Sequence, residues 1–267
     1  MDRSVTILVL KKTKLGETDL IITGFSEDGS QVRAVAKGAR RPGSKLGGSL
    51  ELYSVTRVLM YEGKGLGIIR EVARLDSNEA CRADVIHSAG AAVIVELIEQ
   101  ISSEGNTEPR LFPLAREALR CLGDTPEDEV FLITAAAALK IGAQLGYRPS
   151  LQECVFCGSV VRLAEPAAYC HPEQAAQHRS IDFSFNEGGA ICDDCSCSLG
   201  DIPRESLDTQ LAYWIEILIS SKFIDLEQFR GTSYSSLGKL LLRFTRNWIC
   251  YHVVKRLKSL DFLLSFV

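Results

Sequence analysis

Gln31-Val32-Arg33-Ala34-Val35-Ala36-Lys37 has apolar side chains at every second position, with polar residues at Arg33 and at both ends. A period of two predicts a β-strand that turns one face toward a core. Similar runs lie at residues 5–11, 19–25, 50–61 and 66–75, and turn-forming pairs such as Asp28-Gly29 separate them. These short strands together predict a small closed barrel, because closure removes exposed sheet edges. An SH3-like barrel fits the pattern almost as well.

The periodicity changes to that of a helix after about residue 77. Apolar residues between Val85 and Ile101 predict a helix that is capped by Ser77 or Asn78 and ends near Gly105. Further helices are predicted at 111–122, 126–146, about 203–221 and 233–260. The first three would form a bundle, and the segment between 150 and 200 interrupts it. We therefore expect an α+β multidomain chain with a barrel at 1–76, a helical part at 77–150, an insertion at 151–200 and a second helical part at 201–267.

Composition is that of a soluble globular protein, with 46% hydrophobic and 24% charged residues. This balance argues against disordered and fibrous proteins. The longest charge-free stretches, 85–95 and 130–139, are shorter than the roughly 18 apolar residues of a membrane helix. The apolar run at 5–10 is too short for a signal peptide. We expect no membrane segment and a cytoplasmic location.

The chain has nine cysteines, and six of them lie in the segment from Cys154 to Cys197. Two pairs have metal-ligand spacing, Cys154-Val-Phe-Cys157-Gly and Gly188-Gly189-Ala-Ile-Cys192-Asp-Asp-Cys195. Each pair can place two thiolates on one side of a metal, and tetrahedral zinc takes four such ligands. The pattern predicts one zinc ion. Four protein ligands leave no open position, so the zinc would be structural.

Other potential ligands lie close to these two pairs. Cys197 could replace Cys195, and Cys170, His171 or His178 could enter a mixed site. The regular spacing favours Cys154, Cys157, Cys192 and Cys195 over these alternatives.

Basic charge is concentrated at the front of the chain, although the net charge is −4. Residues 1–80 carry 13 basic and 10 acidic side chains. The loop with Lys37, Arg40, Arg41 and Lys45 contains no acid, and its Gly and Pro residues let it follow a phosphate backbone. Strand position and charge add four candidates for DNA contact: Lys11, Lys14, Arg33 and Arg57. The alternative interpretation is a solvated basic loop.

A second basic stretch lies on the last predicted helix, which has no acid from Lys239 to Leu260. Arg243 and Arg246 are three residues apart, so both can reach one anionic partner. An apolar stripe beside them would accept a bulky side chain, or it would belong to the bundle core. The stripe consists of Leu240, Leu241, Phe244, Trp248 and Ile249.

The sequence lacks P-loop, GxGxxG, HExxH and GxSxG motifs, so we expect that the protein is not an enzyme.

The order of four features resembles the bacterial DNA repair and recombination protein family RecO along essentially the whole chain. These features are the Lys37-Gly-Ala-Arg40-Arg41 loop, the helical domain, the CxxCG and GGxxCxxC segments, and a final helix with Tyr251-His252 before Leu257-Lys258-Ser259-Leu260. A transcription-type zinc ribbon and a scaffold that binds no DNA remain as alternative classes.

The resemblance implies an N-terminal OB fold that binds single- and double-stranded DNA, and a helical domain that carries a zinc finger. It implies zinc ligation by the four cysteines named above and DNA contact by Lys37, Arg40 and Arg41. RecO-like proteins anneal complementary strands without enzymatic turnover. They bind the acidic, Phe-ending tail of single-stranded-DNA-binding protein, join RecR and help RecA load. Arg243 and Arg246 are the candidates for the tail, and the resemblance implies association with the nucleoid.

Overall fold

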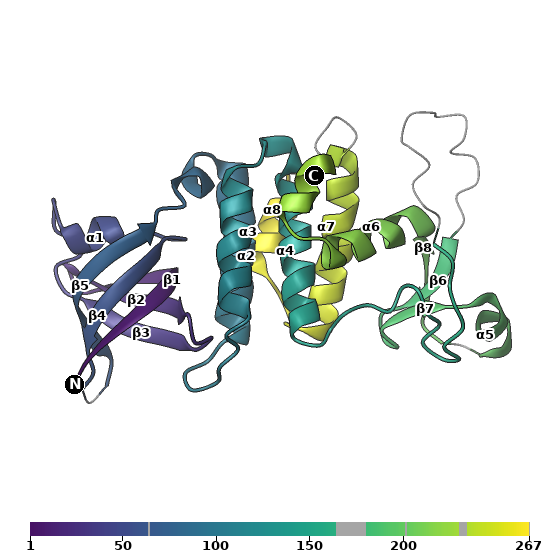
Figure 1. Ribbon diagram of the computed structural model, residues 1–267, viewed down its shortest axis with the longest axis horizontal. Helices are drawn as coiled ribbons and strands as arrows, with labels where there is room; N and C mark the ends of the chain where they lie inside the picture. The colour runs from purple at the N-terminus through teal and green to yellow at the C-terminus, as the bar shows by residue number, and fades with distance from the viewer. Residues whose placement is uncertain (64, 164–179, 201, 230–233, 267) are drawn as a thin grey trace. The chain divides into compact units, whose positions relative to one another are not determined.

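The computed structural model describes residues 1–63, 65–163, 180–200, 202–229 and 234–266 (Figure 1). The chain divides into two compact units. The first contains Met1–Val130 and Leu257–Phe266, and the second contains Phe131–Arg256. Within the described residues, no helix combines the length and the apolar character that a bilayer crossing requires.

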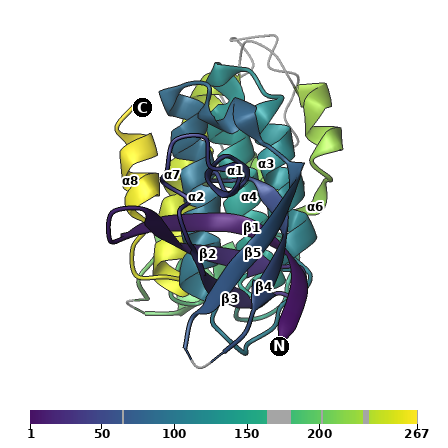
Figure 2. The ribbon, with the colours of Figure 1, turned by 90° about the vertical axis from the view of Figure 1, so that its left-hand side faces the viewer.

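The first unit begins with a closed barrel whose strand order is β1-β2-β3-β5-β4 (Figure 2). Its strands are β1 (Asp2–Leu15), β2 (Asp19–Ser26), β3 (Gln31–Ala36), β4 (Val55–Tyr61) and β5 (Gly67–Asp76). Antiparallel pairing of β1 with β4 and parallel pairing of β3 with β5 close the barrel. This is an OB-like barrel, and the expected fold class is confirmed.

Alternation along the strands separates the barrel core from its surface. Val32, Ala34 and Ala36 are buried, whereas Arg33 between them is exposed. The core is packed closely, because a Cβ added at Gly24 would lie 2.8 Å from a side-chain atom of Ile7. The period-two pattern in the sequence therefore corresponds to the inner face of the barrel.

A short helix, α1 (Lys45–Ser49), lies at one end of the barrel, and the N-terminus lies at the other end (Figure 1). The Ser44 side chain caps it by accepting a hydrogen bond from the Gly47 backbone at 3.3 Å. Leu50 follows with a fully buried side chain. The predicted strand at 50–61 is wrong at its start, because residues 50–54 form this helix exit and β4 begins only at Val55.

Helices complete the first unit. They are η1 (Glu79–Arg82), α2 (Val85–Ile101), α3 (Leu111–Gly123), η2 (Glu127–Glu129) and α8 (Lys258–Leu264). The predicted cap at Ser77 or Asn78 is wrong for α2. Asp84 caps this helix, because its carboxylate accepts hydrogen bonds from the backbone of Ile86 and His87, each at 2.9 Å.

The predicted helix at 233–260 is divided into α7 (Tyr234–His252) and α8. The β-branched pair Val253-Val254 follows α7 and is a weak helix former. Glu96 on α2 then caps α8, since its carboxylate accepts hydrogen bonds from the backbone of Lys258 at 3.1 Å and of Ser259 at 2.8 Å. This cap comes from a residue distant in the sequence, so the local pattern could not reveal it.

The second unit combines helices with a small sheet of order β7-β6-β8. Its elements are α4 (Val130–Gln144), β6 (Ser180–Ser184), β7 (Gly189–Ile191), α5 (Asp193–Ser198), β8 (Glu205–Asp208), α6 (Thr209–Ser220), η3 (Ile224–Phe229) and α7. The predicted helix at 203–221 is wrong at its start, because residues 205–208 pair with β6 as a strand. Asp208 then caps α6 through hydrogen bonds from Gln210 and Leu211.

Candidate metal centre and nucleic-acid interface

Four cysteine side chains from two segments meet in the second unit. Cys154 and Cys157 lie in a tight turn, in which Gly158 has a φ of +72° and donates a backbone hydrogen bond to Cys154 at 2.9 Å. Cys192 and Cys195 lie at the start of α5, where the Cys192 sulfur accepts from the Cys195 backbone at 3.5 Å. All four sulfur atoms are within 4.8 Å of one another. The two pairs that the sequence singled out therefore form one cluster.

The cluster has dimensions that suit a tetrahedral metal ion. Zinc–sulfur bonds of about 2.3 Å place neighbouring sulfurs about 3.8 Å apart. The Cys157 and Cys192 sulfurs are 3.6 Å apart. Val161, Ala190 and Ile191 pack around the buried Cys154, and this apolar support fixes the cluster. The four cysteines could hold one metal ion.

Protonation of the thiols is uneven across the cluster. Burial acts to raise the pKa of Cys154, but backbone N–H groups of Cys192, Cys157 and Phe156 outweigh it and lower the pKa to about 6. Hydrogen bonding from Ser159 also lowers the pKa of Cys157. The Cys157 side chain raises the pKa of Cys195 to about 12. The surroundings thus favour the thiolate form at Cys154 and the thiol form at Cys195, and a bound cation would displace a proton from Cys195.

Cys197 has an exposed side chain on α5 and lies outside the group of four. The other potential ligands, Cys170, His171 and His178, are outside the described residues.

Basic side chains gather in a cleft of about 570 Å³ beside α1 at one end of the barrel. Lys12, Lys14, Arg40 and Arg41 line it, together with Glu51 and the glycines of the loop. A bulge in β1 between Val9 and Lys11 shifts the alternation. Lys12 and Lys14 consequently lie opposite the inward-facing residues Ile22 and Leu20. Lys12 was not predicted as a lining residue, because the strand pattern in the sequence does not reveal a bulge.

The cations of this cleft differ in the ion pairs and hydrogen bonds that they form with other residues. Lys12 pairs with Glu51 at 2.8 Å. The Arg40 guanidinium donates to the backbone carbonyls of Gly16 at 3.1 Å and Glu17 at 2.8 Å. In the part of the chain that the structure describes, Lys14 and Arg41 take part in no ion pair. These two are the cations that remain available to an incoming phosphate.

Asp19 fixes the base of the loop. Its carboxylate accepts a hydrogen bond from the Gly38 backbone at 2.8 Å. This bond and a second from Thr18 lower the pKa of Asp19, and the charges of Lys37 and Arg41 act in the same direction. The carboxylate therefore stays ionised and holds the loop that carries the arginines.

The other predicted DNA contacts are distributed more widely. Lys37 and Lys45 are exposed on the loop and on α1. Lys11 pairs with Glu99 of α2 at 2.7 Å. Arg33 lines a different cleft, and Arg57 is exposed on β4 opposite Thr6 of β1. The structure therefore brings Lys14, Arg40 and Arg41 together but places Lys11, Arg33 and Arg57 elsewhere.

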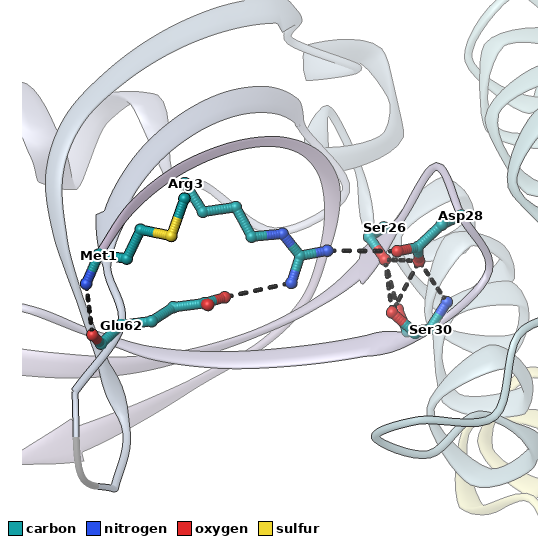
Figure 3. Close-up of polar contacts among 6 residues, drawn as sticks. All are labelled: Met1, Arg3, Ser26, Asp28, Ser30 and Glu62. Atoms are coloured by element: carbon teal, nitrogen blue, oxygen red, sulfur yellow. Dashed lines mark hydrogen bonds and ion pairs between the residues drawn. The ribbon is translucent and has the colours of Figure 1, made fainter.

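At the end of the barrel near the N-terminus, Arg3 forms ion pairs with other residues of the barrel (Figure 3). Arg3 pairs with Asp28 at 3.3 Å and with Glu62 at 3.1 Å. Asp28 also accepts hydrogen bonds from Ser26 and Ser30, which lower its pKa, and the N-terminal amine donates to the Glu62 carbonyl at 2.9 Å. Carboxylates therefore compensate the charge of Arg3 at this end, in contrast to Lys14 and Arg41 in the cleft beside α1.

On α7, Arg243 and Arg246 are exposed, as a partner site requires. The apolar stripe beside them is mostly core: Leu241, Phe244, Trp248 and Ile249 are buried, and only Leu240 is half exposed. The stripe as a whole therefore forms no open slot for a partner side chain.

The barrel, the helical region and the four-cysteine cluster define a class of protein, in which an OB-like barrel precedes a helical domain with a potential metal finger. Comparison with known families gives two adjoining matches. "Recombination protein O N terminal" matches residues 1–78, and "Recombination protein O C terminal" matches residues 82–261. The chain belongs to the RecO family of DNA repair proteins, which confirms the resemblance seen in the sequence.

Relatives with the name DNA repair protein RecO align over most of the chain. The protein from Alkaliphilus metalliredigens is 31% identical over 88% of this chain and 89% of its own length. The protein from Symbiobacterium thermophilum is 28% identical over 96% of this chain and 94% of its own length. The alignment with the Desulfitobacterium hafniense protein is 30% identical over 70% of this chain, but it covers only 62% of that relative.

Proposed function

We propose that this protein is a non-enzymatic recombination mediator that binds single- and double-stranded DNA through the basic cleft beside α1. The observation that carries this proposal is the cleft itself, where Lys14 and Arg41 have no ion-pair partner among the described residues. Release of counterions from a phosphate backbone would drive binding at such a site without regard to sequence. Lys11, Arg33, Lys37, Lys45 and Arg57 would extend the contact surface.

The direct test is a titration of fluorescently labelled single- and double-stranded oligonucleotides with the purified protein. We expect binding to strands of unrelated sequence and a linear decrease of log affinity with log salt concentration. A protein that binds neither form of DNA at low salt would contradict the proposal and would favour a pure interaction scaffold.

We propose further that Cys154, Cys157, Cys192 and Cys195 hold one structural zinc ion. The close approach of the four sulfurs and the absence of a free coordination position in a four-thiolate site support this role. When bound, zinc would cross-link the two cysteine segments, and its binding energy would contribute to folding of the second unit.

The family membership supports finer proposals about partners. The protein would anneal complementary strands in the cytoplasm, in association with the nucleoid, and would act with RecR to help RecA load onto coated strands. Arg243 and Arg246 would meet the acidic tail of single-stranded-DNA-binding protein, since both are exposed on α7.

The tail proposal predicts the effect of reversing either charge. Arg243→Glu or Arg246→Glu should weaken binding of an acidic, Phe-ending peptide several-fold, because repulsion replaces a charge-assisted contact. Isothermal titration with the peptide measures this, and Arg243→Lys is the charge-conserving control. Equal affinity of the wild-type protein and both reversal variants would exclude this surface.

A further inference from the structure

A second cleft, also of about 570 Å³, opens in the second unit between β6, the segment around β8 and α7. Three aromatic side chains line it: Phe183 is buried, Phe185 is half-buried and Tyr251 is 55% exposed. Four exposed polar side chains line it as well, namely Asn186, Arg204, Glu205 and Asn247. The cleft therefore combines the flat apolar surface of aromatic rings with side chains that can form hydrogen bonds.

Tyr251 is held in a fixed position although more than half of its surface is exposed. Its hydroxyl donates a hydrogen bond to Oδ1 of Asn186 at 2.7 Å. Its ring contacts His252 edge-on at 4.8 Å between centroids and lies 6.4 Å from the Phe185 ring. A ring that is fixed at its tip and its edge offers a flat face for stacking at little further cost in conformational entropy.

The polar groups suit the edge of a nucleobase. Asn247 lies one helical turn before Tyr251 and offers both a donor and an acceptor. Glu205 can accept a hydrogen bond from an exocyclic amine. Among the described residues, no hydrogen bond involves the Asn247 side chain.

The charge of the cleft argues against an acidic peptide as its occupant. Arg204 lies in the lining, but its guanidinium is near Asp182 at 3.6 Å and donates to the Ser196 carbonyl at 2.9 Å. The lining thus holds one basic and one acidic side chain, and the guanidinium of Arg204 is already engaged in these contacts. An engaged Arg204 offers little attraction to a carboxylate-rich tail, whereas a base that is held by stacking and hydrogen bonds does not require a cation.

We propose that this cleft binds one unstacked base of a single strand of nucleic acid, which stacks on Tyr251 and forms hydrogen bonds with Asn247 and Glu205. The inference rests on the proposed function, because phosphate contacts at the barrel supply most of the affinity for the strand. The cleft adds a contact that depends on the presence of a base, which phosphate contacts cannot provide.

The test uses the full-length, zinc-loaded protein and a single-stranded oligonucleotide that contains the fluorescent base 2-aminopurine. Stacking on Tyr251 should quench the fluorescence when the wild-type protein binds. Tyr251→Leu should abolish the quenching and weaken binding about 5- to 30-fold at constant salt. The slope of log affinity against log salt should not change, because no phosphate contact is lost.

Two variants control for general effects of the substitution. Phe262→Leu alters an aromatic side chain on α8 that is 50% exposed, and it should leave quenching and affinity unchanged. Tyr251→Phe keeps the ring but loses the bond to Asn186, and it should retain the quenching. Loss of quenching in the Phe262 variant would show that the signal does not report this cleft and would overturn the assignment.

The outcomes separate this inference from the proposed function. A wild-type protein that binds no single strand would overturn both. Normal strand binding with equal quenching and affinity in Tyr251→Leu would overturn the cleft assignment alone. If Tyr251→Leu keeps the quenching but loses an acidic, Phe-ending peptide, the cleft belongs to a peptide and the inference is wrong.

Discussion

Arg40 and Arg41 are adjacent in the sequence, but their side chains have different surroundings. Arg40 fixes the turn between β1 and β2 through two backbone carbonyls, whereas Arg41 faces the cleft without an ion-pair partner among the described residues. Arg41→Gln should reduce the slope of log affinity against log salt by about 0.7 for a single strand, which corresponds to one lost phosphate contact. Arg40→Gln should change the slope less. Fluorescence anisotropy at several salt concentrations measures both, and the reverse order would contradict these roles.

Two glycines with positive φ allow the stability cost of backbone strain to be compared with the added cost of a steric clash. Gly29 has a φ of +85°, and a Cβ there would lie 2.1 Å from the Glu108 backbone. Gly16 has a φ of +59° and open space around it. Gly16→Ala should cost about 1 kcal/mol of stability through strain alone, and Gly29→Ala about 2–5 kcal/mol, because it must also separate the turn from the segment before α3. Urea denaturation compares them. Equal losses would show that the contact at Glu108 is unimportant.

At the scale of elements, we predict that the loss of one cysteine of the cluster prevents proper folding of the second unit. Cys154→Ser and Cys192→Ser should each lose zinc and most of the soluble protein, because an incomplete ligand set leaves two chain segments unconnected. Cys197→Ser is the matched control and should retain one zinc per chain, since Cys197 is exposed outside the group. Elemental analysis of protein purified without chelator measures the metal. Release of zinc by Cys197→Ser alone would refute the ligand assignment.

The sequence predicted elements best where the determining interaction is local. The alternation at β3 and the CxxC spacing led directly to the barrel and to the cluster. Prediction was wrong where a distant partner decides the conformation: β8 is a strand because β6 pairs with it, and α8 begins where Glu96 caps it. In the candidate DNA site, charge identified Lys14, Arg40 and Arg41. The ion pair between Lys11 and Glu99 could be recognised only in the folded structure.

At the scale of the molecule, the two ends of the barrel differ in how their cations are paired. Both ends carry cations, so net charge alone does not distinguish them. Arg3 and Arg70 pair with Asp28, Glu62 and Asp2, whereas Lys14 and Arg41 form no ion pair within the described residues. An incoming phosphate would have to displace carboxylates from the first pair but no ion-pair partner among the described residues from the second. The cleft beside α1 should therefore dominate DNA binding.

The most direct test compares two double variants, each of which removes two positive charges from the barrel. One variant carries Lys14→Gln and Arg41→Gln, and the other carries Arg3→Gln and Arg70→Gln, so that both have the same net charge. Affinity for a labelled single strand is measured across a series of salt concentrations. We predict that the slope of log affinity against log salt falls by about 1.4 in the first variant and stays close to the wild-type value in the second. Equal reductions in both variants, or a reduction in the second alone, would contradict the assignment of DNA binding to this cleft.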